Sequence, residues 1–281
     1  MLRSSSPGLL LSRSFGMPVL FASLCFSLTV TLVADETHHD RDVLETPAFD
    51  SFVVLPLELH VLQSSSVPEL QCGLTDEDLA RILGKVNAIW NKAGIHWGLV
   101  SIVREPAVSS KRFLLMRDLG IEVPLNDYRA ILPNNTKTSK KSLSVYYLHA
   151  FPVNGVWLGD GVALVQETAK LRAVEGGIDE PLPRVTAHEL GHALGLSHRQ
   201  DRINLMASGT TGTSLNTAEV KKSREKAGEM SGALTVQTMR EKAEAPDLER
   251  TLALRYWTWL SEIPGGPTQL ARRRIEELGG Q

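Results

Sequence analysis

Three histidines and one glutamate occur within the eleven residues His188-Glu-Leu-Gly-His-Ala-Leu-Gly-Leu-Ser-His198. On a helix, residues four apart share a face, so His188 and His192 can bind one metal ion through their imidazoles. A helix alone supplies only these two ligands. The chain must therefore turn sharply, and Gly195 can take the left-handed conformation that ends a helix. The spacing predicts a helix, a turn at Gly195 and a third ligand at His198.

Three neutral imidazole nitrogens suit Zn²⁺ and leave the fourth tetrahedral position open for water, which distinguishes a catalytic site from a closed structural one. Glu189 directly follows the first histidine, so its carboxylate can lie beside that water without binding the metal. A glutamate there can take a proton from the water as it attacks a carbonyl and pass it to the leaving amine. The segment predicts one catalytic zinc ion with Glu189 as general base.

Periodic apolar residues predict the elements around this motif. Residues 52–62 alternate apolar and polar side chains, as a strand does. Residues 75–94 begin with Thr75 and Asp78 in capping-box spacing and carry one apolar stripe, which predicts a helix. Further strands are expected at 95–103, 142–151 and 155–165, short helical pieces between 111 and 141, and helices from Asn216 and in the tail beyond 231.

The histidine segment resembles the long zinc-binding motif of the metzincin endopeptidases, and Asn204 to Gly209 ("NLMASG") resembles their Met-turn. The upstream pattern is similar to matrixin-like metzincins, so that the resemblance covers about residues 50–228. It implies that His188, His192 and His198 bind zinc, that Glu189 is the base, and that Met206 forms a hydrophobic floor under the metal. Two positions depart from related families. Arg199 stands where matrixins commonly have serine, and Ser208 where astacins and serralysins have tyrosine.

The resemblance also implies an α+β, metzincin-like zincin fold, with a mixed twisted sheet, an antiparallel edge strand, an active-site helix and a helical C-terminal subdomain. An extended substrate can pair with an exposed strand edge through main-chain hydrogen bonds. We therefore expect zinc-dependent cleavage inside polypeptides. The edge residues expected to bind substrate are Gly155, Val156, Trp157, Leu158 and Gly159.

The N-terminal region has the features of a targeting segment. Arg3 and Arg13 precede the uncharged run from residue 14 to residue 34, which predicts a signal peptide cleaved after Ala34 or an uncleaved membrane anchor. A secreted or extracytoplasmic protein follows from the first, and a membrane-anchored one from the second. The remaining domains are expected to be a linker or short pro-segment (35–50), a catalytic domain (51–228) and a helical C-terminal extension (229–281).

Charge and cysteine content limit the classes of partner and regulation that are expected. The formal net charge is −2 without a basic stripe, which argues against a nucleic-acid partner and leaves polypeptide substrates. The oligomeric state stays open. Cys72 is the one cysteine outside the targeting segment, and its surroundings loosely resemble the matrixin cysteine switch, although a plain or buried loop cysteine fits better. Asp160 among glycines leaves a structural Ca²⁺ loop open beside an ordinary turn.

Two other functions remain open. A catalytically inactive zinc-binding interaction module would use the same histidines without hydrolysis, but it would be expected to lose the glutamate, and Glu189 is present. A membrane-tethered protease would act on neighbours at a membrane surface. The C-terminal extension has no function that its sequence reveals.

Overall fold

The computed structural model describes residues 45–119, 123–133 and 141–279. Contacts divide the chain into residues 1–40 and residues 41–281, and all described residues lie in the second unit. The expected signal peptide or anchor, and residues 35–44 of the expected linker, lie outside the described residues. Within the described ranges, no helix combines the length and the apolar character needed to cross a membrane.

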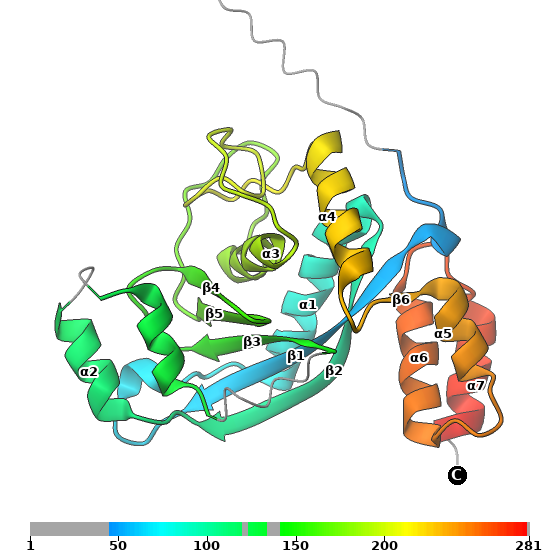
Figure 1. Cartoon of the computed structure of the whole chain (residues 1–281), viewed down its shortest axis with the longest axis horizontal. Helices are drawn as coiled ribbons and strands as arrows, with labels where there is room; N and C mark the ends of the chain where they lie inside the picture. Colours follow the sequence, from blue (N-terminus) through cyan, green and yellow to red (C-terminus); the bar gives the residue numbers. More distant parts are fainter. Residues whose placement is uncertain (1–44, 120–122, 134–140, 280–281) are drawn as a thin grey trace, which may run out of the picture. The chain divides into compact units, whose positions relative to one another are not determined.

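The described residues form a mixed six-stranded sheet with the order β2-β1-β3-β5-β4 and with β6 paired to β1 (Figure 1). The inner pairs are parallel, whereas β4 is antiparallel to β5 and β6 is antiparallel to β1. The strands are β1 (Val53–Gln63), β2 (Ile95–Pro106), β3 (Leu143–Leu148), β4 (Gly155–Gly159), β5 (Val162–Gln166) and β6 (Leu234–Thr235). The expected α+β fold with a mixed sheet and an antiparallel edge strand is confirmed.

The alternation predicted for residues 52–62 is confirmed in β1. Leu55, Leu57 and Leu59 are buried on one face of the sheet, while Pro56 and Glu58 between them are half-buried on the other face. The leucine side packs against α1 and α3 in one core cluster. The strand period of two thus gathers the leucines on the face that α1 and α3 cover.

Helices lie between the strands and after the last strand along the chain. They are α1 (Asp76–Trp90), α2 (Ser110–Leu119), α3 (Pro181–Ala193), α4 (Thr217–Glu229), α5 (Val236–Ala243), α6 (Arg250–Glu262) and α7 (Thr268–Gly279), with a longer 3₁₀ segment η5 (Leu125–Ile131). The capping box predicted for α1 is present: Asp78 N donates to Thr75 Oγ1 at 3.2 Å, and Thr75 N donates to Asp78 Oδ2 at 3.1 Å. Such a box satisfies two backbone donors that the helix itself leaves free.

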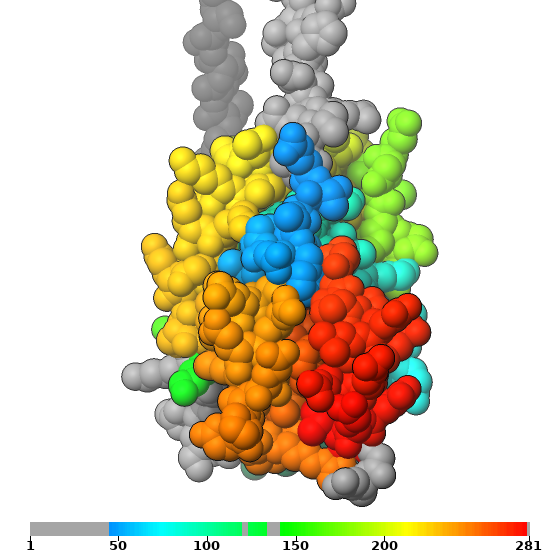
Figure 2. Space-filling view, turned by 90° about the vertical axis from the view of Figure 1, so that its right-hand side faces the viewer, coloured from blue at the N-terminus to red at the C-terminus, as the bar shows by residue number. Residues whose placement is uncertain are grey.

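The opposite face of the sheet is covered in two places. At one end of β1, α2 and η5 pack on Leu62. At the other end, α5, α6 and α7 pack on Phe52 and Val54. Figure 2 shows residues 45–52 (blue) between α4 (yellow) and the C-terminal helices (orange to red). Trp259 of α6 lies on the backbone of β2, where a Cβ added to Gly98 would be 2.5 Å from the indole ring. The tail is thus a packed part of this core.

The segment 155–165, expected as one strand, is a hairpin of β4 and β5, and that expectation was wrong. Asp160 and Gly161 form its turn, with φ of 47° and 78°. Two consecutive residues with positive φ form the tight hairpin turn whose twist matches that of the strands, and Asp-Gly is a strong sequence signal for it. The edge strand therefore ends at Gly159.

Candidate metal centre

Helix α3 carries the first two histidines and stops where the sequence predicts. Gly195 has φ of 79°, its N–H donates to His192 O at 3.0 Å, and Leu196 N donates to Gly191 O at 3.0 Å. This pair of bonds is a Schellman motif, in which a left-handed glycine caps the last carbonyls of a helix and reverses the chain. The chain then returns toward the helix with His198.

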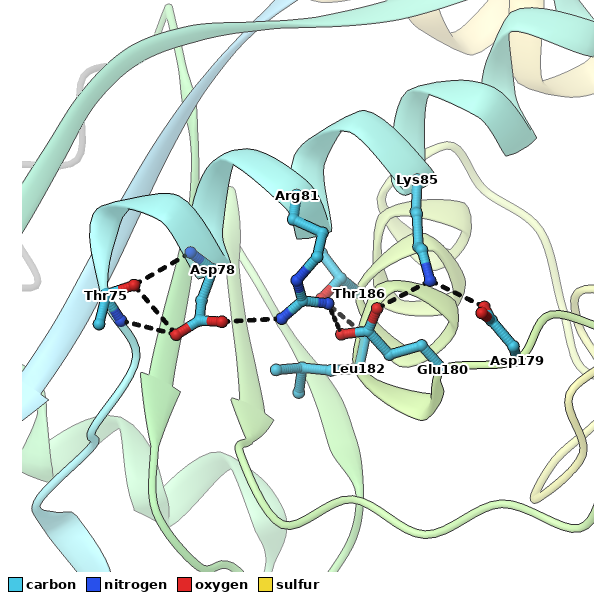
Figure 3. Close-up of polar contacts among 8 residues, drawn as sticks. All are labelled: Thr75, Asp78, Arg81, Lys85, Asp179, Glu180, Leu182 and Thr186. Carbon is cyan, nitrogen blue, oxygen red and sulfur yellow. Dashed lines mark hydrogen bonds and ion pairs between the residues drawn. The ribbon is translucent and has the colours of Figure 1, made fainter.

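Contacts with α1 fix the position of α3. Arg81 and Lys85 of α1 pair with Glu180, just before α3, and Lys85 also lies 2.8 Å from Asp179 (Figure 3). Inside the core, Trp90 Nε1 donates to Ala187 O at 3.2 Å. Exposed ion pairs contribute little to stability, so the buried contacts carry most of this attachment.

The structure brings the three predicted histidines together. One ligand atom from each of His188, His192 and His198 lies within 4.8 Å of the others. Among the described residues, no other group of three or more histidine, cysteine, aspartate or glutamate side chains comes this close together. His188 Nδ1 lies 2.8 Å from Leu205 O and His192 Nδ1 lies 2.8 Å from Leu196 O. A carbonyl only accepts, so both Nδ1 atoms carry the proton and both Nε2 atoms present a lone pair.

This donor set fits zinc. His192 Nε2 lies 3.1 Å from His198 Nε2. Two nitrogens bound tetrahedrally to one zinc ion at about 2.0–2.1 Å are separated by about 3.3 Å, close to this distance. Burial lowers the pKa of His188 to about 3 and also lowers the pKa of His192. Both rings are therefore neutral at physiological pH, as metal ligands must be.

Glu189 is buried beside the same cleft. Burial raises the pKa of its carboxyl to about 8, while a hydrogen bond from the backbone N–H of Trp157 and the charge of Arg184 oppose that rise. A dication nearby would also lower the pKa of Glu189. Helix α3 approaches β4 closely here. A Cβ added to Gly155 would lie 2.8 Å from Glu189 Oε1 and 2.6 Å from Val185 Cγ1. Glu189 therefore lies between α3 and the edge strand β4.

Met206 is fully buried and lies against α3. A Cβ added to Gly191 would lie 2.6 Å from Met206 Sδ, so only glycine leaves room for the thioether. Met206 N donates to Asn204 Oδ1 at 2.7 Å, and Met206 O accepts from Arg199 N at 3.0 Å. These bonds connect the methionine turn to the residue that follows His198.

A cleft of about 840 Å³ lies over this centre and is lined by all three histidines, Glu189 and the first part of β4. Of the predicted edge residues, Gly155, Val156 and Trp157 line it. The carbonyls of Leu158 and Gly159 instead accept hydrogen bonds from Arg129 Nη2 of η5, at 2.7 and 2.9 Å. The first half of β4 borders the cleft, and η5 binds carbonyl groups of the second half.

Residues 140–226 match the family model described as Matrixin. Over this segment, the chain is similar to the matrixin family. The matched segment includes β3, β4, β5, α3 and most of α4, and therefore contains the three histidines, Glu189 and Met206. The resemblance expected from the motif is confirmed for this part of the chain. A comparison with curated proteins finds no match.

Similar solved structures include one described as a chaperone–substrate complex, archaemetzincin from Methanopyrus kandleri and metalloproteinase-II from Bacteroides fragilis. Their sequence identities are 13%, 14% and 15%, and their TM-scores are 0.38, 0.40 and 0.35, respectively. The matches cover 64%, 62% and 65% of this chain, and 36%, 96% and 55% of the other chains. The chain thus spans about a third of the first structure and about half of the third.

Arg184 is a residue of the matrixin segment that the sequence analysis missed. It lies one helical turn before His188, is buried, and lines the cleft. Its guanidinium donates to the carbonyls of Ala207 and Gly212 in the loop after Met206. Its Nη1 also lies 3.3 Å from His188 Nδ1, a contact between two donors. An arginine at this position on a helix gave no signal, because its carbonyl partners come from a distant loop.

Cys72 is a buried free cysteine in the loop before α1. Its N–H donates to Leu62 O at 3.0 Å, and burial raises the pKa of its thiol to about 12. The cleft lining, as far as the chain is described, does not include it. The interpretation as a buried loop cysteine is confirmed.

Proposed function

We propose that the chain is a zinc-dependent endopeptidase that hydrolyses peptide bonds within extended polypeptides. The convergence of three imidazoles next to the buried Glu189, in the lining of an open cleft, carries this proposal. The match to the matrixin family supports it. His188, His192 and His198 would hold the metal.

When bound, zinc would supply a Lewis acid that polarises the scissile carbonyl and makes a water molecule acidic near neutral pH. The residues of the chain supply the rest. The carboxylate of Glu189 takes a proton from the attacking water and returns it to the leaving amine. The hydrogen bond from Trp157 N–H holds that carboxylate on the substrate side of α3.

The first half of β4 orients the substrate. Gly155, Val156 and Trp157 line the cleft at the edge of the sheet, where the backbone of an extended peptide can add to the strand. Such pairing recognises main chain instead of one particular side chain. It favours unfolded or extended segments of polypeptides as substrates.

The test compares the wild type with Glu189→Gln, both loaded with zinc, on an unstructured fluorescent polypeptide. We expect the variant to bind one zinc ion per chain, as the wild type does, and to hydrolyse at least about 100-fold more slowly. Glu225→Gln on α4 is the matched exposed control and should keep full activity. A chelator should abolish wild-type hydrolysis.

An inactive zinc-binding interaction module is the second candidate. It is favoured if the zinc-loaded wild type hydrolyses no member of a diverse peptide library while it still binds zinc. The presence of Glu189 beside the histidines argues for the endopeptidase, because binding without hydrolysis needs no base there.

We further propose that the protein is exported and that the N-terminal segment is removed. The charge and apolar pattern of residues 1–34 supports this. Fractionation of producing cells should find a chain that lacks its first 34 residues outside the cytoplasm. A full-length, membrane-bound form would instead favour the membrane-tethered protease.

A further inference from the structure

Arg199 and Glu219 form an ion pair next to the third histidine of the metal centre. Arg199 Nε lies 2.7 Å from Glu219 Oε1. Arg199 directly follows His198 in the chain, whereas Glu219 lies in the first turn of α4. The carboxylate is 3% exposed and the arginine side chain 50% exposed, so the interior member of the pair is the anion. This pair accounts for the arginine that departs from the usual matrixin serine.

Glu219 also binds the methionine turn. Its Oε2 accepts from Asn204 Nδ2 at 2.8 Å and from Asn216 N at 3.0 Å. Asn204 Oδ1 in turn accepts from Met206 N at 2.7 Å. A buried carboxylate is costly unless such donors satisfy it. Glu219 therefore connects the segment after His198 with the segment that carries Met206.

The third histidine depends on this connection more than the other two. His188 and His192 lie on α3, and a backbone carbonyl accepts from the Nδ1 of each. His198 lies on a loop, and in the described part of the chain no carbonyl accepts a hydrogen bond from its ring. The backbone at residues 198 and 199 must therefore set its position, and that backbone bonds to Met206 O through Arg199 N at 3.0 Å.

We propose that Arg199 and Glu219 are positioning residues for the metal centre, because together they hold His198 and Met206 in the arrangement in which the three imidazoles converge. The inference rests on the proposed zinc site. It concerns metal affinity and ligand geometry, which can be measured without any hydrolysis.

The test measures the zinc dissociation constant of purified protein by competition with a chromogenic chelator, and the visible absorption spectrum after Co²⁺ substitution. Arg199→Gln and Glu219→Gln should each weaken zinc binding by about 10- to 100-fold, as loss of a residue that orients a ligand does. Both should change the Co²⁺ absorption bands, which report ligand geometry. The double variant should be no weaker than the worse single variant, because the two side chains act through one contact.

Two controls separate positioning from general stability. Asn216→Ala removes the side-chain cap of α4 but keeps the contacts of Glu219 with Arg199 and Asn204. It should lower the melting temperature of the metal-free protein and leave the zinc dissociation constant unchanged. Glu229→Gln breaks an exposed pair with Lys226 on the same helix and should change neither.

Unchanged zinc affinity and unchanged Co²⁺ spectra in Arg199→Gln would overturn the proposal. This variant decides the question if Glu219→Gln does not fold, since the Arg199 side chain is half exposed. A wild type that fails to bind zinc would overturn the proposed function together with this inference. A wild type that binds zinc tightly beside unaffected variants overturns this inference alone.

Discussion

Gly191, which lies between His188 and His192 in α3, is in contact with Met206, and the contact leaves no room for a side chain on Gly191: an added Cβ would lie 2.6 Å from Met206 Sδ. Met206 is fully buried and cannot swing away. Although alanine normally stabilises a helix relative to glycine, Gly191→Ala should destabilise the protein by about 1–3 kcal/mol through overpacking. Urea unfolding monitored by circular dichroism measures this difference.

Gly84 is the matched control for Gly191. It lies within α1, is exposed, and has no atom within 4 Å of an added Cβ. Gly84→Ala should stabilise the fold by about 0.5–1 kcal/mol, because it removes only backbone freedom. The changes in unfolding free energy of the two variants need not be equal in size. A Gly191→Ala variant that is more stable than the wild type would contradict the packing described for Met206.

Gly155 sets the distance between the edge strand and Glu189. Gly155→Ala should push β4 away from α3, because its Cβ would lie 2.6 Å from Val185 Cγ1. A displacement of about 1 Å at a catalytic group can cost about 100-fold in rate, so we expect a loss of that order in kcat. Steady-state kinetics on a peptide substrate test this. Zinc content should stay at the wild-type level, and an unchanged kcat would show that the strand can move freely.

Cys72 should be unreactive in the folded protein. With a pKa of about 12 and a buried side chain, it has almost no thiolate at pH 8. A chromogenic disulfide reagent should react slowly with native protein and at once after unfolding in guanidinium chloride. Cys72→Ala should neither activate nor inactivate hydrolysis. Activation by this substitution would instead indicate a cysteine switch.

Acid should weaken the attachment of α3 to α1. Burial alone would raise the pKa of Glu180, but hydrogen bonds from Arg81 and Lys85 lower it below its ordinary value. A carboxyl with a lowered folded-state pKa stabilises the fold above its unfolded pKa of about 4.3, and this stabilisation is lost as the pH falls through the folded-state value. The unfolding free energy should therefore decrease between about pH 5 and pH 3. Urea titrations at a series of pH values measure it.

The double variant Arg81→Gln, Lys85→Gln tests the origin of this acid sensitivity. Without either cation, the pKa of Glu180 is no longer lowered, and the decrease in unfolding free energy toward pH 3 should be shallower than in the wild type. Parallel curves for both proteins would assign the acid sensitivity to other carboxyl groups.

Trp259 should anchor the C-terminal helices to the sheet. It is 3% exposed, it packs over Gly98, and its Nε1 donates to Leu99 O at 3.1 Å. Trp259→Ala should cost about 3–5 kcal/mol of unfolding free energy, as truncation of a buried aromatic residue does. Because the residue lies at β2, far along the sheet order from β4, the zinc affinity of the folded variant should not change.

The sequence by itself determined the local elements and the ligand set. Residue spacing fixed the faces on which His188 and His192 project, and the left-handed conformation available to Gly195 marked the end of their helix. The alternation in β1 and the capping box of α1 could also be predicted from the sequence, because each depends on residues only a few positions apart. The Asp160-Gly161 turn carried a local signal of the same kind, although the expected strand ran through it.

Only the tertiary structure decided which distant groups meet. Arg199 pairs with Glu219 across 20 residues, Arg184 reaches carbonyls of the loop after Met206, and Arg129 binds carbonyl groups of β4. The same holds for the packing of Trp259 on Gly98 across the sheet. Such contacts leave no periodic trace in a single sequence, because they depend on how folded elements are placed in space and not on the spacing of residues along one element.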